Sequence, residues 1–220
     1  MLAVFASASL AISTFAAAPA TMRLNEFMAS NVSGLLDEDG QQADWIELFN
    51  GSAAAVNLAG WSLTDDAEEP DKWVFPAVTL SSGQYLIVFA SGKDRRPTSG
   101  LNFHTSFKLN SSGGYLGLFN LPSGPAAISQ IAAAYPEQRN DYSYGMDGVG
   151  NWVYYRTATP GAANGSSSVA QVVQDVSFNV SSGVFDVPFC LVLSSSTIGS
   201  TVRYTIDGSD PTASSGTVYS

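Results

Sequence analysis

Short runs of alternating apolar and polar residues, separated by Gly- and Ser-rich turns, constrain the fold of this chain more than any other feature. In residues 44–50, Ile46 and Leu48 would share one face of a strand, and Trp45 and Phe49 the other. Long stretches with the 3.6-residue periodicity of a helix are absent. Many short strands without intervening helices are typical of sandwiches and barrels, so the sequence predicts an all-β fold. The expected strands of the first part of the chain are residues 23–29, 44–50, 56–64, 72–75, 84–90, 115–121, 128–133 and 151–155.

Changes in composition divide the chain into four expected parts. Residues 1–20 form an apolar, uncharged leader that ends in Ala18-Pro19-Ala20, a pattern typical of signal-peptide cleavage sites, although no Lys or Arg precedes the apolar run. Residues 21–158 hold the strands given above and are expected to form a β-sandwich. Residues 159–170 are rich in Gly and Ser, which predicts a flexible linker.

Beyond the linker, residues 171–220 resume the alternating pattern and include the hairpin-turn pair Asp207-Gly208. A β-sandwich has about 100 residues. We therefore expect a partial second sandwich here, at the front of a longer protein.

The leader and the charge limit where the chain works and what it binds. A cleaved leader predicts a secreted or cell-surface protein without a stable membrane span. The formal net charge is −10, from 19 acidic and 9 basic residues. Because that field repels a phosphate backbone, nucleic acid is not expected as a partner, which leaves a protein or a cell-surface glycan.

Residue types that carry catalysis are scarce. The one histidine, His104, has no G-x-S-x-G motif beside it and is expected in a loop or at a strand edge. The one cysteine, Cys190, lies in the apolar run 187–192, which predicts a buried structural thiol. We predict no catalytic and no cofactor-binding residues, and therefore no enzyme within these residues.

Two charged stretches could hold ions. Asp37, Asp39 and Asp44 offer the oxygen ligands that calcium prefers, although their spacing does not match an EF-hand loop and an Asp-rich turn ending at Gly40 explains them as well. The basic residues in 93–96 suggest either a solvated loop or a site for an anionic glycan or phosphate.

The aromatic residues leave an alternative function open. Exposed rings of Trp45, Trp61, Trp73 or Trp152 could stack on sugars, as in a carbohydrate-binding module of a secreted glycan-degrading enzyme. Packing in the interior of the sandwich is the other explanation.

Three motifs in order resemble the lamin-tail domain of bacterial proteins: LNEFMA at residues 24–29, DWIELFN at 44–50 and VNLAGWSLTD at 56–65. The resemblance extends over roughly residues 21–164. It implies an immunoglobulin-like sandwich that is not an enzyme and that serves binding or display.

Residues 176–185, followed by YTIDGSDPT at 204–212, resemble the C-terminal β domain of chitobiase and β-hexosaminidase, another small sandwich without catalytic residues. Such a pair often precedes a spore-coat-type kinase region or a hydrolase in exported bacterial proteins. The two resemblances imply a non-catalytic extracellular or cell-surface binding or spacer module, the N-terminal accessory region of a larger exported protein.

Overall fold

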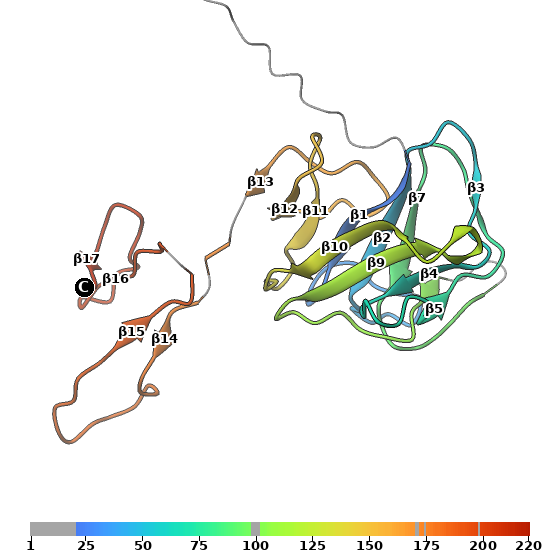
Figure 1. Ribbon diagram of the computed structural model, residues 1–220. Helices are drawn as coiled ribbons and strands as arrows, with labels where there is room; N and C mark the ends of the chain where they lie inside the picture. Colours follow the sequence, from blue (N-terminus) through green and yellow to red (C-terminus); the bar gives the residue numbers. More distant parts are fainter. Residues whose placement is uncertain (1–20, 98–101, 170–171, 174, 198) are drawn as a thin grey trace, which may run out of the picture. The chain divides into compact units, whose positions relative to one another are not determined.

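A computed structural model describes residues 21–97, 102–169, 172–173, 175–197 and 199–220. The predicted leader, residues 1–20, lies outside the described residues. The chain divides into two compact units, Met1–Ala170 and Gln171–Ser220 (Figure 1). No helix among the described residues is long and apolar enough to cross a membrane.

The larger sheet of the first unit has seven strands in the order β13-β12-β11-β1-β2-β7-β8. Neighbouring strands are antiparallel except β7 and β8, which are parallel. Its strands are β1 (Met22–Met28), β2 (Trp45–Asn50), β7 (Tyr85–Phe89), β8 (Phe103–His104), β11 (Ser143–Met146), β12 (Trp152–Tyr155) and β13 (Ser168–Val169).

A second sheet has four strands in the order β10-β9-β4-β5 and packs across the first sheet (Figure 1). A short pair, β3 with β6, and one 3-10 turn, η1, complete this unit among the described residues. The bounds are β3 (Val56–Asn57), β4 (Trp61–Thr64), β5 (Trp73–Val74), β6 (Thr79–Leu80), β9 (Gly114–Asn120), η1 (Leu121–Ser123) and β10 (Ala127–Tyr135).

The core lies between the two sheets and follows the alternation seen in the sequence. Ile46 and Leu48 of β2 are fully buried in this core, together with Leu63 of β4 and Leu118 of β9. Each such side chain stabilises the fold by about 1.5–3 kcal/mol through burial. Trp45 points to the other face of β2 and joins a separate cluster. The all-β fold predicted from the sequence is confirmed.

Strand positions differ from the prediction where the backbone turns sharply. The expected strand 56–64 is divided into β3 and β4, because Gly60 adopts a positive φ of 77° between them. The two-residue strand β8 and the strand β11 were not among the expected strands.

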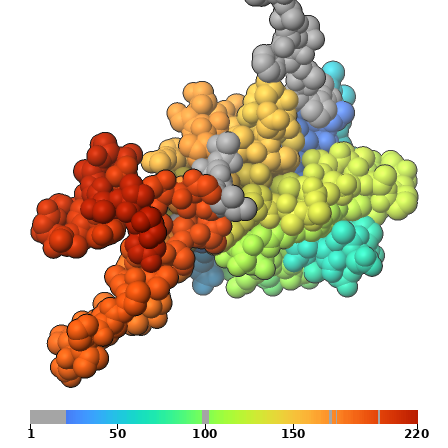
Figure 2. Space-filling view, turned by 60° about the vertical axis from the view of Figure 1, so that its left-hand side comes forward, coloured from blue at the N-terminus to red at the C-terminus, as the bar shows by residue number. Residues whose placement is uncertain are grey.

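The second unit consists of two separate ribbons among its described residues. The ribbon β14-β15 pairs β14 (Ser177–Phe178) with β15 (Leu193–Ser194), and the ribbon β16-β17 pairs β16 (Arg203–Tyr204) with β17 (Thr217–Val218). In Figure 2 the orange and red residues of this unit form narrow lobes rather than a filled body.

The predicted burial of Cys190 is wrong, because this thiol is exposed. Its neighbours Val187, Phe189 and Leu191 are 71%, 45% and 43% exposed. The reason is that no second sheet covers this apolar run among the described residues, so that its side chains have nothing to pack against.

Candidate functional site on the outer face of the seven-stranded sheet

The outer face of the larger sheet carries the polar and charged side chains that β1, β2 and β8 turn away from the core. The side chains that β2 turns to this face include Trp45 and Glu47, and both are nevertheless fully buried. The cover comes from two irregular segments, the loop between β1 and β2 and the segment that follows β12. We call residues 159–164 of the latter the strap.

Two buried carboxyl groups lie side by side beneath the strap. A bulge in β1 between Leu24 and Glu26 shifts the register, so that Glu26 lies opposite Glu47 of β2. Glu26 accepts hydrogen bonds from the Ser143 hydroxyl (2.5 Å) and from the backbone N–H and the hydroxyl of Thr159 (both 3.1 Å). Burial raises the pKa of Glu26 despite these donors.

Glu47 holds the middle of the strap. Its carboxyl oxygens accept hydrogen bonds from the Asn25 side chain (2.8 Å) and from the Gly161 backbone N–H (2.5 Å). Burial, reinforced by the neighbouring Glu26, raises the pKa of Glu47 to about 8. Glu47 therefore holds its proton to a higher pH than an ordinary carboxyl group does.

Asn164 fixes the end of the strap. Its side-chain amide donates to the backbone oxygens of Asn25 (3.0 Å) and Met146 (2.8 Å), and its oxygen accepts from the Asn25 side chain (2.9 Å). Gly145 permits this approach, since a Cβ there would lie 2.6 Å from the Asn164 nitrogen. The first six residues of the predicted flexible linker 159–170 are thus hydrogen-bonded to the sandwich. The bonds are made by the buried carboxyl groups of Glu26 and Glu47 and by the side-chain amide of Asn164.

The acidic loop after β1 forms a second charged cluster. Asp37 and Asp39, two of the three calcium candidates, both pair with the ammonium of Lys93, with 2.6 Å from Nζ to Asp39. Asp37 also accepts from the backbone N–H groups of Asp39 and Gln41 (both 2.9 Å), the geometry of an Asp turn. Burial opposes ionisation of Asp37, but these donors and Lys93 bring its pKa below the usual value.

The third calcium candidate, Asp44, has a different environment. It accepts a long hydrogen bond (3.4 Å) from the Asn31 backbone N–H, and burial raises its pKa to about 6. Among the described residues, no group of three or more His, Cys, Asp or Glu side chains is arranged to hold a metal ion. Calcium binding therefore stays a prediction, and Lys93 occupies the space between two of its three candidates.

The basic stretch 93–96 turns back onto the protein. Arg95 pairs with Glu38 (2.9 Å) and Asp39 (2.8 Å). Arg96 pairs with Asp94 (2.6 Å) and lies over the Trp73 ring, 5.2 Å from its centroid. These cations are neutralised within the molecule, so an anionic ligand would have to displace a carboxylate.

His104 lies on the edge strand β8 and is completely buried. Its Nε2 faces both oxygens of Glu38 (3.0 Å each), and its Nδ1 faces the Ser91 hydroxyl (2.8 Å). The ionised Glu38 accepts from Nε2–H, and in the neutral imidazole Nδ1 then accepts from the Ser91 hydroxyl. The sequence did not indicate these partners, because Glu38 and Ser91 are 66 and 13 residues away.

The order Ser91, His104, Glu38 is that of an acyl-transfer triad. The other hydrogen bonds of these residues, however, join loops to one another, which is a structural role. Glu38 is also bound by Arg95 and Asn102, and the Ser91 hydroxyl accepts from the Lys93 backbone N–H (3.2 Å). The N–H of Gly92, which would be the obvious oxyanion donor, is already bonded to the Phe107 carbonyl (3.1 Å).

The tryptophans do not form a sugar-binding platform in the first unit. Trp45, Trp61 and Trp73 are buried, and the half-buried Trp152 stacks on Tyr144 with centroids 5.8 Å apart. The large hydrophobic residues that are exposed in the described part of this unit are aliphatic: Val32, Leu36, Ile128 and Val149.

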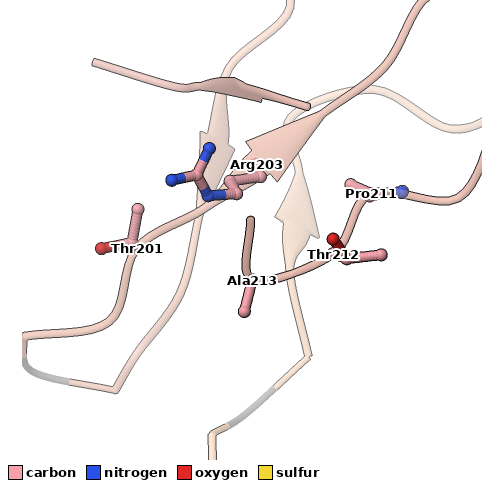
Figure 3. A pocket seen from close by; sticks show the side chains of 5 residues that line it. All are labelled: Thr201, Arg203, Pro211, Thr212 and Ala213. Carbon is pink, nitrogen blue, oxygen red and sulfur yellow. The ribbon is translucent and has the colours of Figure 1, made fainter. Parts of the chain in front are cut away.

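Concave regions occur in both units among the described residues. In the second unit, an open hollow of about 430 Å³ is lined by Thr201, Arg203, Pro211, Thr212 and Ala213. Figure 3 shows how these side chains lie around it. The Arg203 guanidinium already donates to the Gly216 carbonyl (2.9 Å). In the first unit, a mostly apolar pocket of about 310 Å³ lies beside the strap and is lined by Met28, Gly34, Leu35, Trp45, Asp141, Ala158 and Pro160.

Comparison with known proteins agrees with this architecture. No curated protein matches the chain. Residues 180–220 match the family model of the chitobiase/beta-hexosaminidase C-terminal domain, and residues 16–133 match that of the Lamin Tail Domain, as their motifs predicted. Both families are β-sandwich modules that are not catalytic. Since the match to the Lamin Tail Domain model spans more than half of the 220 residues, the chain belongs to the Lamin Tail Domain family.

Proposed function

We propose that the chain is a non-catalytic binding and spacer module of the cell exterior, secreted or held at the cell surface. It would be the N-terminal accessory region of a larger exported protein, for example one with a spore-coat-type kinase or a hydrolase domain. The match to two consecutive non-catalytic module families supports this proposal.

The observation that carries the spacer function is the strap. Glu26 and Asn25 bind it from β1, the central strand of the larger sheet, and Glu47 binds it from the neighbouring strand β2. The strap leads into β13, which pairs with β12 at the edge of the same sheet, so the chain leaves the unit from a fixed point. A rigid exit point is what a module needs in order to position a neighbouring domain.

Export tests the location. Residues 1–20 fused to a reporter enzyme should direct it out of a bacterial cell, and N-terminal sequencing of the full chain recovered outside should begin at Thr21. A fusion without residues 1–20 is the control. Retention of both fusions inside the cell would contradict the proposal.

Envelope binding tests the function. The full chain, added to purified cell envelopes, should sediment with them, and protease treatment of the envelopes should abolish sedimentation if the partner is a protein. Retention instead on insoluble chitin or cellulose would favour the alternative, a carbohydrate-binding module. Failure to sediment with either would contradict a binding role.

A further inference from the structure

The apolar pocket beside the strap has the chemistry of a recognition site. Met28, Leu35, Ala158 and Pro160 supply an apolar lining, and the volume of about 310 Å³ lies at the lower end of the range for ligand pockets. Such a lining excludes water and favours an apolar side chain.

Trp45 adds an unmet hydrogen-bonding requirement. Its side chain is fully buried and lines the pocket, yet its indole N–H has no acceptor among the described residues. A buried donor without a partner is unfavourable, and native structures satisfy nearly all of them. An occupant that brings an oxygen acceptor to Trp45 would remove this penalty.

The rim of the pocket is acidic. Asp141 accepts hydrogen bonds from the backbone N–H groups of Val32 and Ser33 (both 2.8 Å) and from the Ser33 hydroxyl (2.7 Å). Burial opposes ionisation, but these donors lower the pKa of Asp141, and no salt bridge neutralises it among the described residues.

Exposed apolar residues flank the same loop. Val32 and Leu36 are 54% and 51% exposed on either side of Gly34 and Leu35, which line the pocket. With a net charge of −10, the whole chain attracts basic partners and repels acidic ones.

We propose that this pocket binds an extended, basic segment of a protein partner. One apolar side chain of that segment enters between Leu35 and Pro160, a backbone carbonyl accepts from the indole N–H of Trp45, and a flanking Lys or Arg pairs with Asp141. The inference rests on the proposed binding function and names the class of its partner.

Nuclear magnetic resonance tests the site directly. The full chain, labelled with ¹⁵N, has four indole N–H signals, and the Trp45→Phe variant assigns the relevant one. The probe is the synthetic peptide acetyl-Gly-Lys-Leu-Lys-Gly-amide. We expect the Trp45 signal to move downfield and saturate, with a dissociation constant on the order of millimolar.

Two further peptides define the chemistry. Replacing both Lys by Glu should weaken binding at least tenfold, and replacing Leu by Ala should abolish saturation. Equal shifts with all three peptides would overturn the assignment. So would a saturating shift of the Trp45 signal by chito-oligosaccharides in place of peptide.

Two variants localise the site. Ala158→Leu fills the pocket and should abolish the shift, whereas Ala53→Leu makes the same change at an exposed turn and should leave binding intact. Asp141→Asn should weaken binding about threefold to tenfold if it pairs with a Lys. Binding that survives Ala158→Leu in a chain of unchanged melting temperature would overturn the proposal, while envelope sedimentation would still report on the proposed function.

Discussion

Glu26 and Glu47 lie opposite each other on adjacent strands, both are buried, and between them they bind two backbone N–H groups of the strap. A pair of neighbouring carboxyl groups in a dry environment cannot readily carry two negative charges. The strap is therefore held by a site whose charge depends on pH.

Stability should fall as the pH rises from about 4.5 to about 8. The pKa of Glu47 is raised to about 8 in the folded chain from a usual value of 4.5, so the folded state binds the proton more tightly than the unfolded state. Under this linkage the contribution of Glu47 to stability is fully present below pH 4.5, and about 3–5 kcal/mol of it is lost by pH 8.

Urea midpoints measured between pH 5 and 9 would show this decline. Glu47→Gln should flatten the curve, because the amide does not titrate. A wild-type curve that is already flat over this range would rule out the coupling.

Removing the Asn164 side chain should loosen the strap. Asn164→Ala deletes two donated hydrogen bonds and two accepted ones, the longer of which comes from the Thr159 hydroxyl (3.4 Å), at a cost of roughly 1–3 kcal/mol. Hydrogen exchange of the Thr159 and Gly161 amides should accelerate. Ser166→Ala, at an exposed position just beyond the strap, is the control and should leave both rates unchanged.

Lys93 should contribute more to the stability of the fold than Arg96, although both form ion pairs. Lys93→Met would leave the fully buried Asp37 side chain without its cation, which costs roughly 2–4 kcal/mol. Arg96→Met breaks a pair with the half-exposed Asp94, which is worth less than about 1 kcal/mol, and also removes the hydrogen bond to the Val74 carbonyl and the contact with the Trp73 ring. Thermal melts of the two variants compare them directly, and equal losses would contradict this assignment.

Calcium and Lys93 should compete for the same carboxylates. In calorimetry, Lys93→Ala should bind calcium more tightly than the wild-type chain, because Asp37 and Asp39 then lack their cation. Absence of heat from both chains at millimolar calcium would end the calcium hypothesis.

Ser91 should make no contribution to ester hydrolysis. The chain and its Ser91→Ala variant are expected to hydrolyse p-nitrophenyl acetate at the same slow rate, since Gly92 N–H is already bonded and offers no oxyanion donor. A drop of about tenfold or more in the variant would show that the Ser91 hydroxyl takes part in hydrolysis and would contradict this prediction.

The sequence predicts most of the fold, because alternation alone determines which residues of β2 face the core. Ile46 and Leu48 are in the core, as expected. Alternation does not predict that Trp45 and Glu47, on the opposite face, are buried too. The segments that cover them are loops that lie outside the strand in the sequence.

The polar sites were harder to foresee for the same reason. Composition marks residues 159–170 as a linker, but the strap is ordered by Glu26 and Glu47, more than a hundred residues earlier. The acidic turn at Asp37 was foreseen from its own residues, whereas its pairing with Lys93 depends on how two loops meet in the folded sandwich.

The strap also has a mechanical consequence. It binds to β1, which begins at Met22, so a segment near the end of the first unit is attached to the strand that begins the unit. Tension applied between residues 21 and 165 would be carried by the hydrogen bonds of Glu26 and Asn164 before it reached the core. The sandwich could then bear a pulling load at its edge while its two sheets stayed packed.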